Sequence, residues 1–197
     1  MMKPANTRPQ VSQGQDIIRR SMVTAIDENN GEALQSAINA LKPKDVNFVV
    51  VTMTPLAHAA GYPDRTEAIQ ILLKAGANPN FQNRQGDGPL SMAVRWGGPQ
   101  IVELLLKAGA EVNIRNASGI TPLNELAQLT GYYNKSDRNR IAELLLQNGA
   151  DPSIADNQGN TALSLASKRH LGGMLHLFRQ YGKCSDEYVM DYWIESE

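Results

Sequence analysis

One seven-residue pattern recurs along the chain and constrains its fold more than any other feature. It reads Ile-Leu-Leu-Lys-Ala-Gly-Ala at 71–77 and returns in similar form at 104–110 and 144–150, with a weaker echo ending at Gly182. Successive marker glycines lie 33, 40 and 33 residues apart, so the period is 33 with one insertion of seven. A fixed period of this size is typical of repeat proteins, whose units bury their apolar faces against one another.

A second marker opens each unit. It stands at Thr54-Pro55-Leu56, Gly88-Pro89-Leu90, Thr121-Pro122-Leu123 and Thr161-Ala162-Leu163. Proline suits the first position of a helix, and a preceding threonine can accept a hydrogen bond from a free N–H of the first turn. Each unit closes on a glycine, which suits the left-handed conformation at the end of a helix. The pattern therefore predicts two antiparallel helices and one protruding loop in each unit.

These residues resemble the ankyrin repeat family, whose units open on Thr-Pro-Leu-His-x-Ala and close on Leu-Leu-Leu-x-x-Gly-Ala-Asp-Val-Asn. The likeness covers Asp45 to Gly182 and implies an all-α solenoid of stacked helix-turn-helix units with protruding loops. The family's histidine is replaced here by Ala57, Ser91, Asn124 and Ser164. We expect the hydrogen bond of that ring to be missing, with the polar replacements substituting for it locally.

The repeats predict how the chain is divided. A flexible tail covers 1–15, and a degenerate first repeat that caps the stack covers 16–48, with apolar series at 18–26 and 34–41. Further repeats cover about 49–82, 83–115, 116–155 and 156–182, followed by a capping helix or acidic tail at 183–197. Gly172 and Gly173 stand where the last second helix should begin, and each glycine costs about 1 kcal/mol relative to alanine. The last repeat should therefore be the least stable.

Charge and composition narrow the classes of partner. Nineteen Lys and Arg oppose twenty Asp and Glu, so no net field draws the chain to nucleic acid or to a membrane surface. The longest wholly apolar run is only 48–51, far too short to cross a bilayer. Cys184 is the single cysteine, which excludes an intrachain disulfide and is compatible with a reducing compartment. We expect a cytoplasmic protein that is a monomer by itself.

The resemblance implies a non-catalytic adaptor that binds a protein partner on the concave surface of the stack. Carried over position by position, the partner-binding residues are Tyr62, Arg84, Gln85, Asp87, Arg95, Trp96, Ile120, Gln128, Leu129, Lys168 and Arg169. Trp and Arg are enriched in interface hot spots, so we expect Trp96 and Arg95 to contribute most, and their replacement to affect folding little. The alternative is that Trp96 packs on the next repeat and Arg95 is merely solvated.

Two further features could add to such a surface. The insertion at about 130–140 is expected to be a surface loop between two helices, where Tyr132 and Tyr133 offer stiff contact area or serve no function. Lys168 and Arg169, with Arg84, add positive charge that Asp87 and Glu125 partly offset. These cations either face solvent or meet an acidic patch on a partner.

Other functions remain as alternatives. The acidic, aromatic carboxyl-terminal segment resembles the export signals of bacterial type IV secreted effectors, so the chain could be an effector that binds host proteins. A small hydrolase using Cys184 is the enzymatic alternative. Neither a metal-ligand cluster nor a glycine-rich phosphate loop is present, so no cofactor and no metal are expected.

Overall fold

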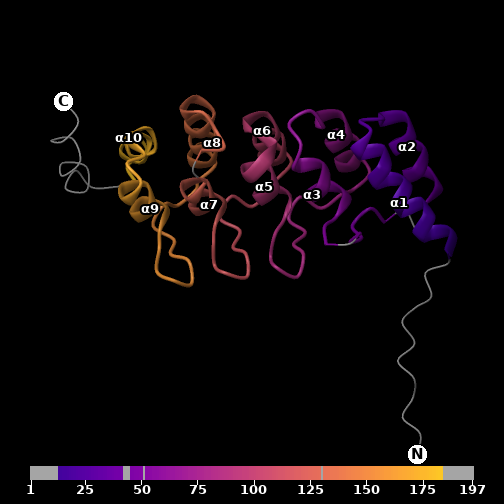
Figure 1. Ribbon diagram of the computed structural model, residues 1–197, viewed down its shortest axis with the longest axis horizontal. Helices are drawn as coiled ribbons and strands as arrows, with labels where there is room; N and C mark the ends of the chain where they lie inside the picture. Colours follow the sequence, from indigo (N-terminus) through magenta and orange to yellow (C-terminus); the bar gives the residue numbers. More distant parts are fainter. Residues whose placement is uncertain (1–12, 42–44, 51, 130, 184–197) are drawn as a thin grey trace, which may run out of the picture.

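The computed structural model describes residues 13–41, 45–50, 52–129 and 131–183. Figure 1 shows helix pairs standing side by side in chain order, with loops projecting from one edge of the row. The described part contains no strand, and the expected all-α solenoid is confirmed. The pairs are α1 (Gln13–Asp27) with α2 (Gly31–Ala40), α3 (Pro55–Ala60) with α4 (Thr66–Lys74), α5 (Pro89–Met92) and η1 (Ala93–Gly97) with α6 (Pro99–Lys107), α7 (Pro122–Gln128) with α8 (Lys135–Gln147), and α9 (Ala162–Lys168) with α10 (Gly172–Gln180).

Both predicted helix signals are present. Thr54, Thr121 and Thr161 each accept a hydrogen bond from a backbone N–H in the first turn of α3, α7 and α9. The glycines after α4, α6, α8 and α10 have φ between +63° and +89°, a region where a side chain would be strained. The threonines therefore mark where these first helices begin, and the glycines mark where the second helices end.

The core is one continuous aliphatic band. Leu72, Leu105 and Leu145 occupy equivalent positions in α4, α6 and α8, and none has exposed surface. The first helices α3, α5, α7 and α9 pack on one another in sequence, and α8 packs between α6 and α10. Since each pair buries its apolar face only against its neighbours, the fold builds a long surface rather than a deep cleft.

Three asparagines at the base of the loops join successive pairs. Asn47, Asn80 and Asn113 lie 33 residues apart, and each Nδ2 donates to the carbonyl of the glycine that ends a helix in the next unit. Each Oδ1 accepts from the backbone N–H two residues beyond that glycine, at 2.6 to 3.0 Å. These side chains satisfy backbone groups that a helix end would otherwise leave unpaired.

Asn124 and Ser164, two of the replacements for the family's histidine, form hydrogen bonds with backbone groups. Buried Asn124 donates from Nδ2 to the carbonyl of Ile154 in the next loop, at 3.0 Å. Ser164 instead bonds within its own helix start, because its hydroxyl accepts from the backbone N–H of Thr161 at 3.0 Å. Asn124 therefore links neighbouring repeats, whereas Ser164 only caps its own helix.

The first helix pair occupies the place of the degenerate repeat. Helix α1 begins at Gln13, so residues 13–15 of the expected tail are helical. Buried Arg65 ties this pair to the next by donating to the carbonyls of Ile26 and Asp27, which end α1. Most of the expected tail lies outside the described residues, at 1–12. The expected cap, apart from Lys183, also lies outside them, at 184–197.

Candidate functional site

Residues at or near the ends of the first helices form a row along the stack, which we call the helix-end row. Tyr62, Arg95, Gln128 and Lys168 take equivalent positions, separated by 33, 33 and 40 residues. Trp96, Leu129 and Arg169 follow directly in the chain. The predicted binding residues of the four repeats therefore occupy matching places beside the turn between the two helices of each pair.

The first helix of the central pair ends in a turn of π-helix, η1, which neither the period of 33 nor the helix caps predict. The Gly98 N–H donates to the carbonyl of Ala93 at 3.0 Å, five residues back. A Cβ on Gly97 would lie 2.2 Å from the carbonyl oxygen of Ala60, so only glycine fits there. Gly98 has φ +83°. The Gly97-Gly98 pair lets this wider turn approach the preceding repeat and carries Trp96 at its surface.

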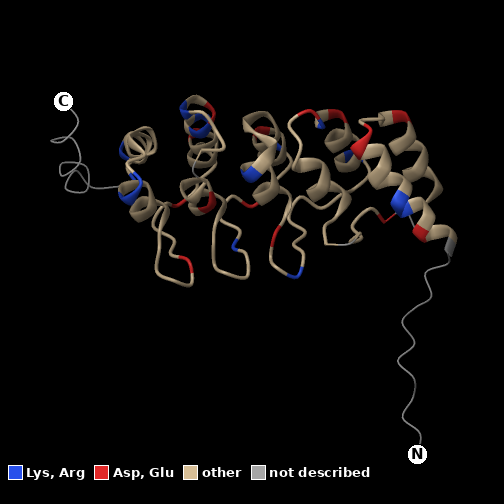
Figure 2. Cartoon of the chain, viewed as in Figure 1, with Lys and Arg blue, Asp and Glu red and all other residues tan. Residues whose placement is uncertain are grey.

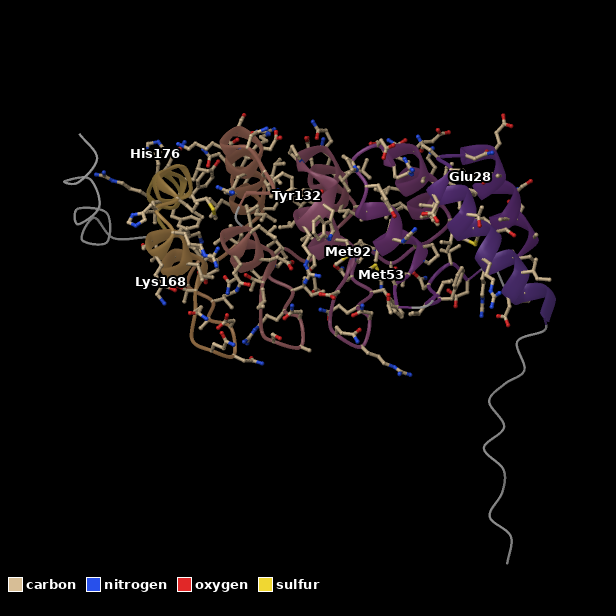
Figure 3. The ribbon with its side chains drawn as sticks, in the orientation of Figure 1. Glu28, Met53, Met92, Tyr132, Lys168 and His176 are labelled. Atoms are coloured by element: carbon tan, nitrogen blue, oxygen red, sulfur yellow. The ribbon has the colours of Figure 1, made fainter. Side chains whose placement is uncertain are left out.

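Three aromatic side chains, which we call the aromatic cluster, connect this turn to the next repeat. Trp96 and Tyr132 meet edge to face with ring centres 4.7 Å apart, and Tyr132 meets Tyr133 in the same way at 5.1 Å. Trp96 is 44% exposed and Tyr132 is 51% exposed. Figure 3 labels Tyr132 near the middle of the stack. Two adjacent repeats thus present one aromatic surface to solvent.

Tyr133 holds the cluster in place. Its hydroxyl accepts from the Gly98 N–H at 3.2 Å and donates to the carbonyl of Ala93 at 3.4 Å, so it closes over the π-helical turn. Burial raises the pKa of Tyr133 to about 12, which keeps the hydroxyl protonated as a donor. The insertion that contains Tyr132 and Tyr133 therefore packs against the preceding repeat, which the expectation of a tolerated surface loop did not include.

The insertion is also more helical than expected. Lys135–Arg140 belong to α8, which is thirteen residues long where α4 and α6 have nine. Asn134 caps this helix by accepting from the Asp137 N–H at 2.8 Å. The expectation of a loop is correct only for 131–133, because Asn134 caps α8 and lets this helix begin at Lys135.

Arg95 is engaged within the molecule. Its Nε donates to Oε1 of Glu125 in α7, and its Nη2 donates to Oδ1 of Asp87 at 3.0 Å. Glu125 is only 6% exposed, and burial raises its pKa to about 7 in spite of the guanidinium beside it. The two carboxylates raise the pKa of Arg95 although its burial acts the other way. Because of these contacts we now expect a change at Arg95 to cost folding stability, contrary to the expectation from the sequence.

Tyr62 belongs to a separate group at the amino-terminal part of the row. It is 38% exposed, its ring meets His58 edge to face at 5.4 Å, and the Arg65 guanidinium lies 5.3 Å from its centre. His58 Nε2 in turn lies 2.7 Å from Oδ1 of Asp27. The contacts that position Tyr62 thus come from the first two helix pairs, whereas those of Trp96 come from the central ones.

The loop tips are linked to one another. Asn83, Asn116 and Asp156 each accept two backbone N–H bonds within their own loops through the side chain. The Gln85 carbonyl accepts from Ala117, and the Ser118 carbonyl accepts from Asn157, both at 2.9 Å. Among the predicted loop residues Arg84 and Gln85 are exposed, and Asp87 and Ile120 are half-buried. The loops in Figure 2 carry charges of both signs.

The predicted cations do not form one patch. Arg84 lies on a loop tip, whereas Lys168 and Arg169 lie at the exposed end of α9. Arg169 donates to the carbonyl of Gln128 at 2.7 Å, and Arg138 donates to that of Leu129 at 3.2 Å. Figure 3 labels Lys168 at the carboxyl-terminal end of the stack. Gln128 and Leu129 therefore contribute backbone carbonyls to the helix-end row, and each carbonyl accepts a hydrogen bond from one guanidinium group.

Nothing in the described part points to metal or membrane chemistry. It contains no group of three or more His, Cys, Asp or Glu side chains that could hold a metal ion. No described helix is both long and apolar enough to cross a membrane. Cys184, the nucleophile of the enzymatic alternative, lies outside the described residues.

Comparison with known proteins agrees with the repeat geometry. The chain is 36% identical over 85 residues to the Transient receptor potential cation channel subfamily A member 1 homolog of Caenorhabditis elegans. That stretch covers 41% of this chain and only 7% of the relative, so the likeness reaches a small part of that protein. A family model for three ankyrin repeats matches residues 21–116, and a model for one ankyrin repeat matches 118–157. With helix pairs, caps and loops in the same register, the chain belongs to the ankyrin repeat family.

Proposed function

We propose that this chain is a non-catalytic adaptor that holds a protein partner on the concave surface formed by the helix-end row and the loop tips. Ankyrin repeats generally mediate protein–protein interaction. The observation that supports this particular surface is the contact between Trp96 and Tyr132, two large rings from adjacent repeats that remain about half exposed. Clustered, exposed aromatic side chains of this kind are typical of interaction sites.

The aromatic cluster is suited to binding because it is already ordered. Tyr133 fixes the turn that carries Trp96, and the edge-to-face contacts restrict both exposed rings. A partner that covers these rings gains their apolar area and loses little side-chain freedom in return. The loop tips, with Arg84 and Gln85, supply the polar rim that surrounds such a centre.

Arg95 has an indirect role in this proposal. Arg95 directly precedes Trp96 in the chain. Its guanidinium contacts both Asp87 in the loop and Glu125 in the next repeat. Arg95 therefore contributes to binding mainly by positioning Trp96, rather than by contacting the partner directly. Lys168 and Arg169, which are exposed at the end of α9, would instead meet an acidic patch on the partner.

The test begins with a partner isolated by affinity capture with the full chain and identified by mass spectrometry. Trp96→Ala and Tyr132→Ala should each weaken binding by about 2 kcal/mol, or roughly thirtyfold, in titration calorimetry. Glu103→Lys on the second helix of the same repeat is the control and should leave the affinity within a factor of a few. Unchanged affinity for both aromatic variants, with unchanged circular dichroism, would remove the aromatic cluster from the proposal.

A further inference from the structure

A basic pocket lies between the start of α8 and the turn that joins α9 to α10. It encloses about 230 Å³, and the cationic side chains of Lys135 and Arg138 lie in its wall beside His170. Gly172 and Gly173, which begin α10, complete it without side chains of their own. A Cβ on Gly173 would lie 2.3 Å from Nδ2 of Asn139, so the glycine allows α8 to approach closely.

Lys135 and Arg138 form no ion pair with a carboxylate of the described residues. The ion pairs that the described residues form involve other cations. Arg138 and Arg169 instead donate to the backbone carbonyls of Leu129 and Gln128, at the end of α7. The nearest acid along α8, Asp137, accepts from Nδ2 of Asn134 at 2.9 Å. Lys135 and Lys168 are exposed. The site is therefore chemically suited to an anion.

The backbone adds to this preference. Helix α10 has nine residues and no side-chain cap at Leu171. The N–H groups of a helix start carry partial positive charge, which favours an anion beside them. Figure 2 shows basic residues on α9 and α10 at this end of the stack. Residues 129–183 carry seven Lys and Arg against four Asp and Glu.

The chain itself contains a segment of matching charge. Residues 184–197 hold five acidic side chains and no basic one, and the aromatic residues Tyr188, Tyr192 and Trp193 lie among them. The described chain ends at Lys183, just after α10, whose nine residues span about 13 Å. An extended chain covers about 3.3 Å per residue, so even Asp191 can reach back to the start of α10.

We propose that the basic pocket is a receptor for carboxylate side chains and that its occupant is the chain's own acidic segment 184–197. The attachment gives the segment an effective concentration in the millimolar range, which compensates for the weakness of exposed ion pairs. Docking is reversible and weakens with salt, because the charges at the rim are screened. This inference does not depend on the aromatic cluster and stands or falls separately from the proposed function.

The test uses the full chain with Trp96→Phe, which leaves Trp193 as the only tryptophan. Acrylamide quenching of its fluorescence should be weak at low salt and should increase in 1 M NaCl. Lys135→Glu with Lys168→Glu should increase it at low salt, since each exposed ion pair shifts the docked-to-free ratio by about two- to fivefold. Lys74→Glu with Arg84→Glu makes the same change of charge elsewhere and should have no effect.

A charge exchange completes the test. Adding Asp186→Lys and Glu187→Lys to the Lys135→Glu, Lys168→Glu chain should restore the protection of Trp193, which a general loss of charge or of folding cannot do. Circular dichroism of every variant checks the fold. Equal quenching in all variants overturns the proposal. It is overturned as well if the control pair exposes Trp193 equally, or if the exchange restores nothing.

Discussion

Arg95 of the central repeat donates to the carboxylate of Glu125 in the next repeat, thirty residues away in the chain. The acceptor is almost completely buried, whereas the guanidinium is partly exposed. A buried carboxylate with one cationic neighbour makes the junction between two repeats depend on protonation. It also makes that junction sensitive to any change at Arg95.

The first prediction concerns pH. Burial raises the pKa of Glu125 to about 7 from an ordinary value of 4.5, so the folded chain favours the protonated form. The stability that this group contributes is complete below pH 4.5 and is lost as the pH rises through about 7. The free energy of unfolding of the wild type, relative to Glu125→Gln, should fall by about 2 kcal/mol between pH 4.5 and 8. Urea unfolding across this range measures it, and parallel profiles would contradict it.

The second prediction concerns the loss of the cation. Arg95→Met keeps an unbranched apolar stem but leaves the Glu125 carboxylate without its neutralising neighbour. At pH 8 the change should cost about 2 to 4 kcal/mol, and at pH 5, where Glu125 is protonated, clearly less. Lys107→Met, which removes an exposed partner of Glu103 on the same repeat, is the matched control and should not change the unfolding midpoint. A loss at pH 8 no greater than that of the control would show that the Arg95–Glu125 contact does not support the junction.

The third prediction concerns the hydroxyl that closes the π-helical turn. Tyr133→Phe keeps the ring contact with Tyr132 but removes the bond to the Gly98 N–H. The loss should destabilise the fold by about 1 kcal/mol. Tyr132→Phe, which changes an exposed ring in the same cluster, should leave the unfolding midpoint where it is. Chemical denaturation compares the two, and equal midpoints for both variants would mean that the hydroxyl bond is not needed.

The fold was predictable because its signals are local. A threonine three residues before a free N–H, or a glycine after a leucine run, acts within one turn of helix, and the period repeats these signals in register. The positions along the helix-end row follow from the same period. The resemblance to ankyrin repeats placed Trp96 at the concave end of the first helix, and in the structure Trp96 is 44% exposed near that helix end.

The contacts of the site were less accessible from the sequence. Asp87 and Glu125 were expected on the face of Arg95 as partial offsets of charge, but burial of Glu125 depends on how closely α7 packs. The bond between Tyr133 and Gly98 joins an insertion to a π-helical turn, and neither follows the period of 33. The repeats predict which positions are equivalent, whereas the insertion and the π-helical turn determine which side chains are in contact at those positions.

The last prediction concerns the asparagines that join the repeats. Asn113 donates to the carbonyl of Gly149 at 3.0 Å and accepts from the Asp151 N–H at 3.0 Å, so it links two helix pairs. Ser153 holds the equivalent place one repeat later, forty residues on, but its hydroxyl bonds only to Asp151 of its own loop.

Asn113→Ala should therefore destabilise the chain by about 1 to 3 kcal/mol, because both backbone partners lose their bonds. Ser153→Ala should cost less, since its loss stays within one exposed loop. Because repeats are stabilised by their interfaces, the change at Asn113 should also loosen the stack locally. The increase in hydrogen exchange over the wild type should then be larger at the amides of α9 and α10 than at those of α3 and α4. Equal stability of the two variants, with uniform exchange along the stack, would show that the asparagine does not couple the repeats.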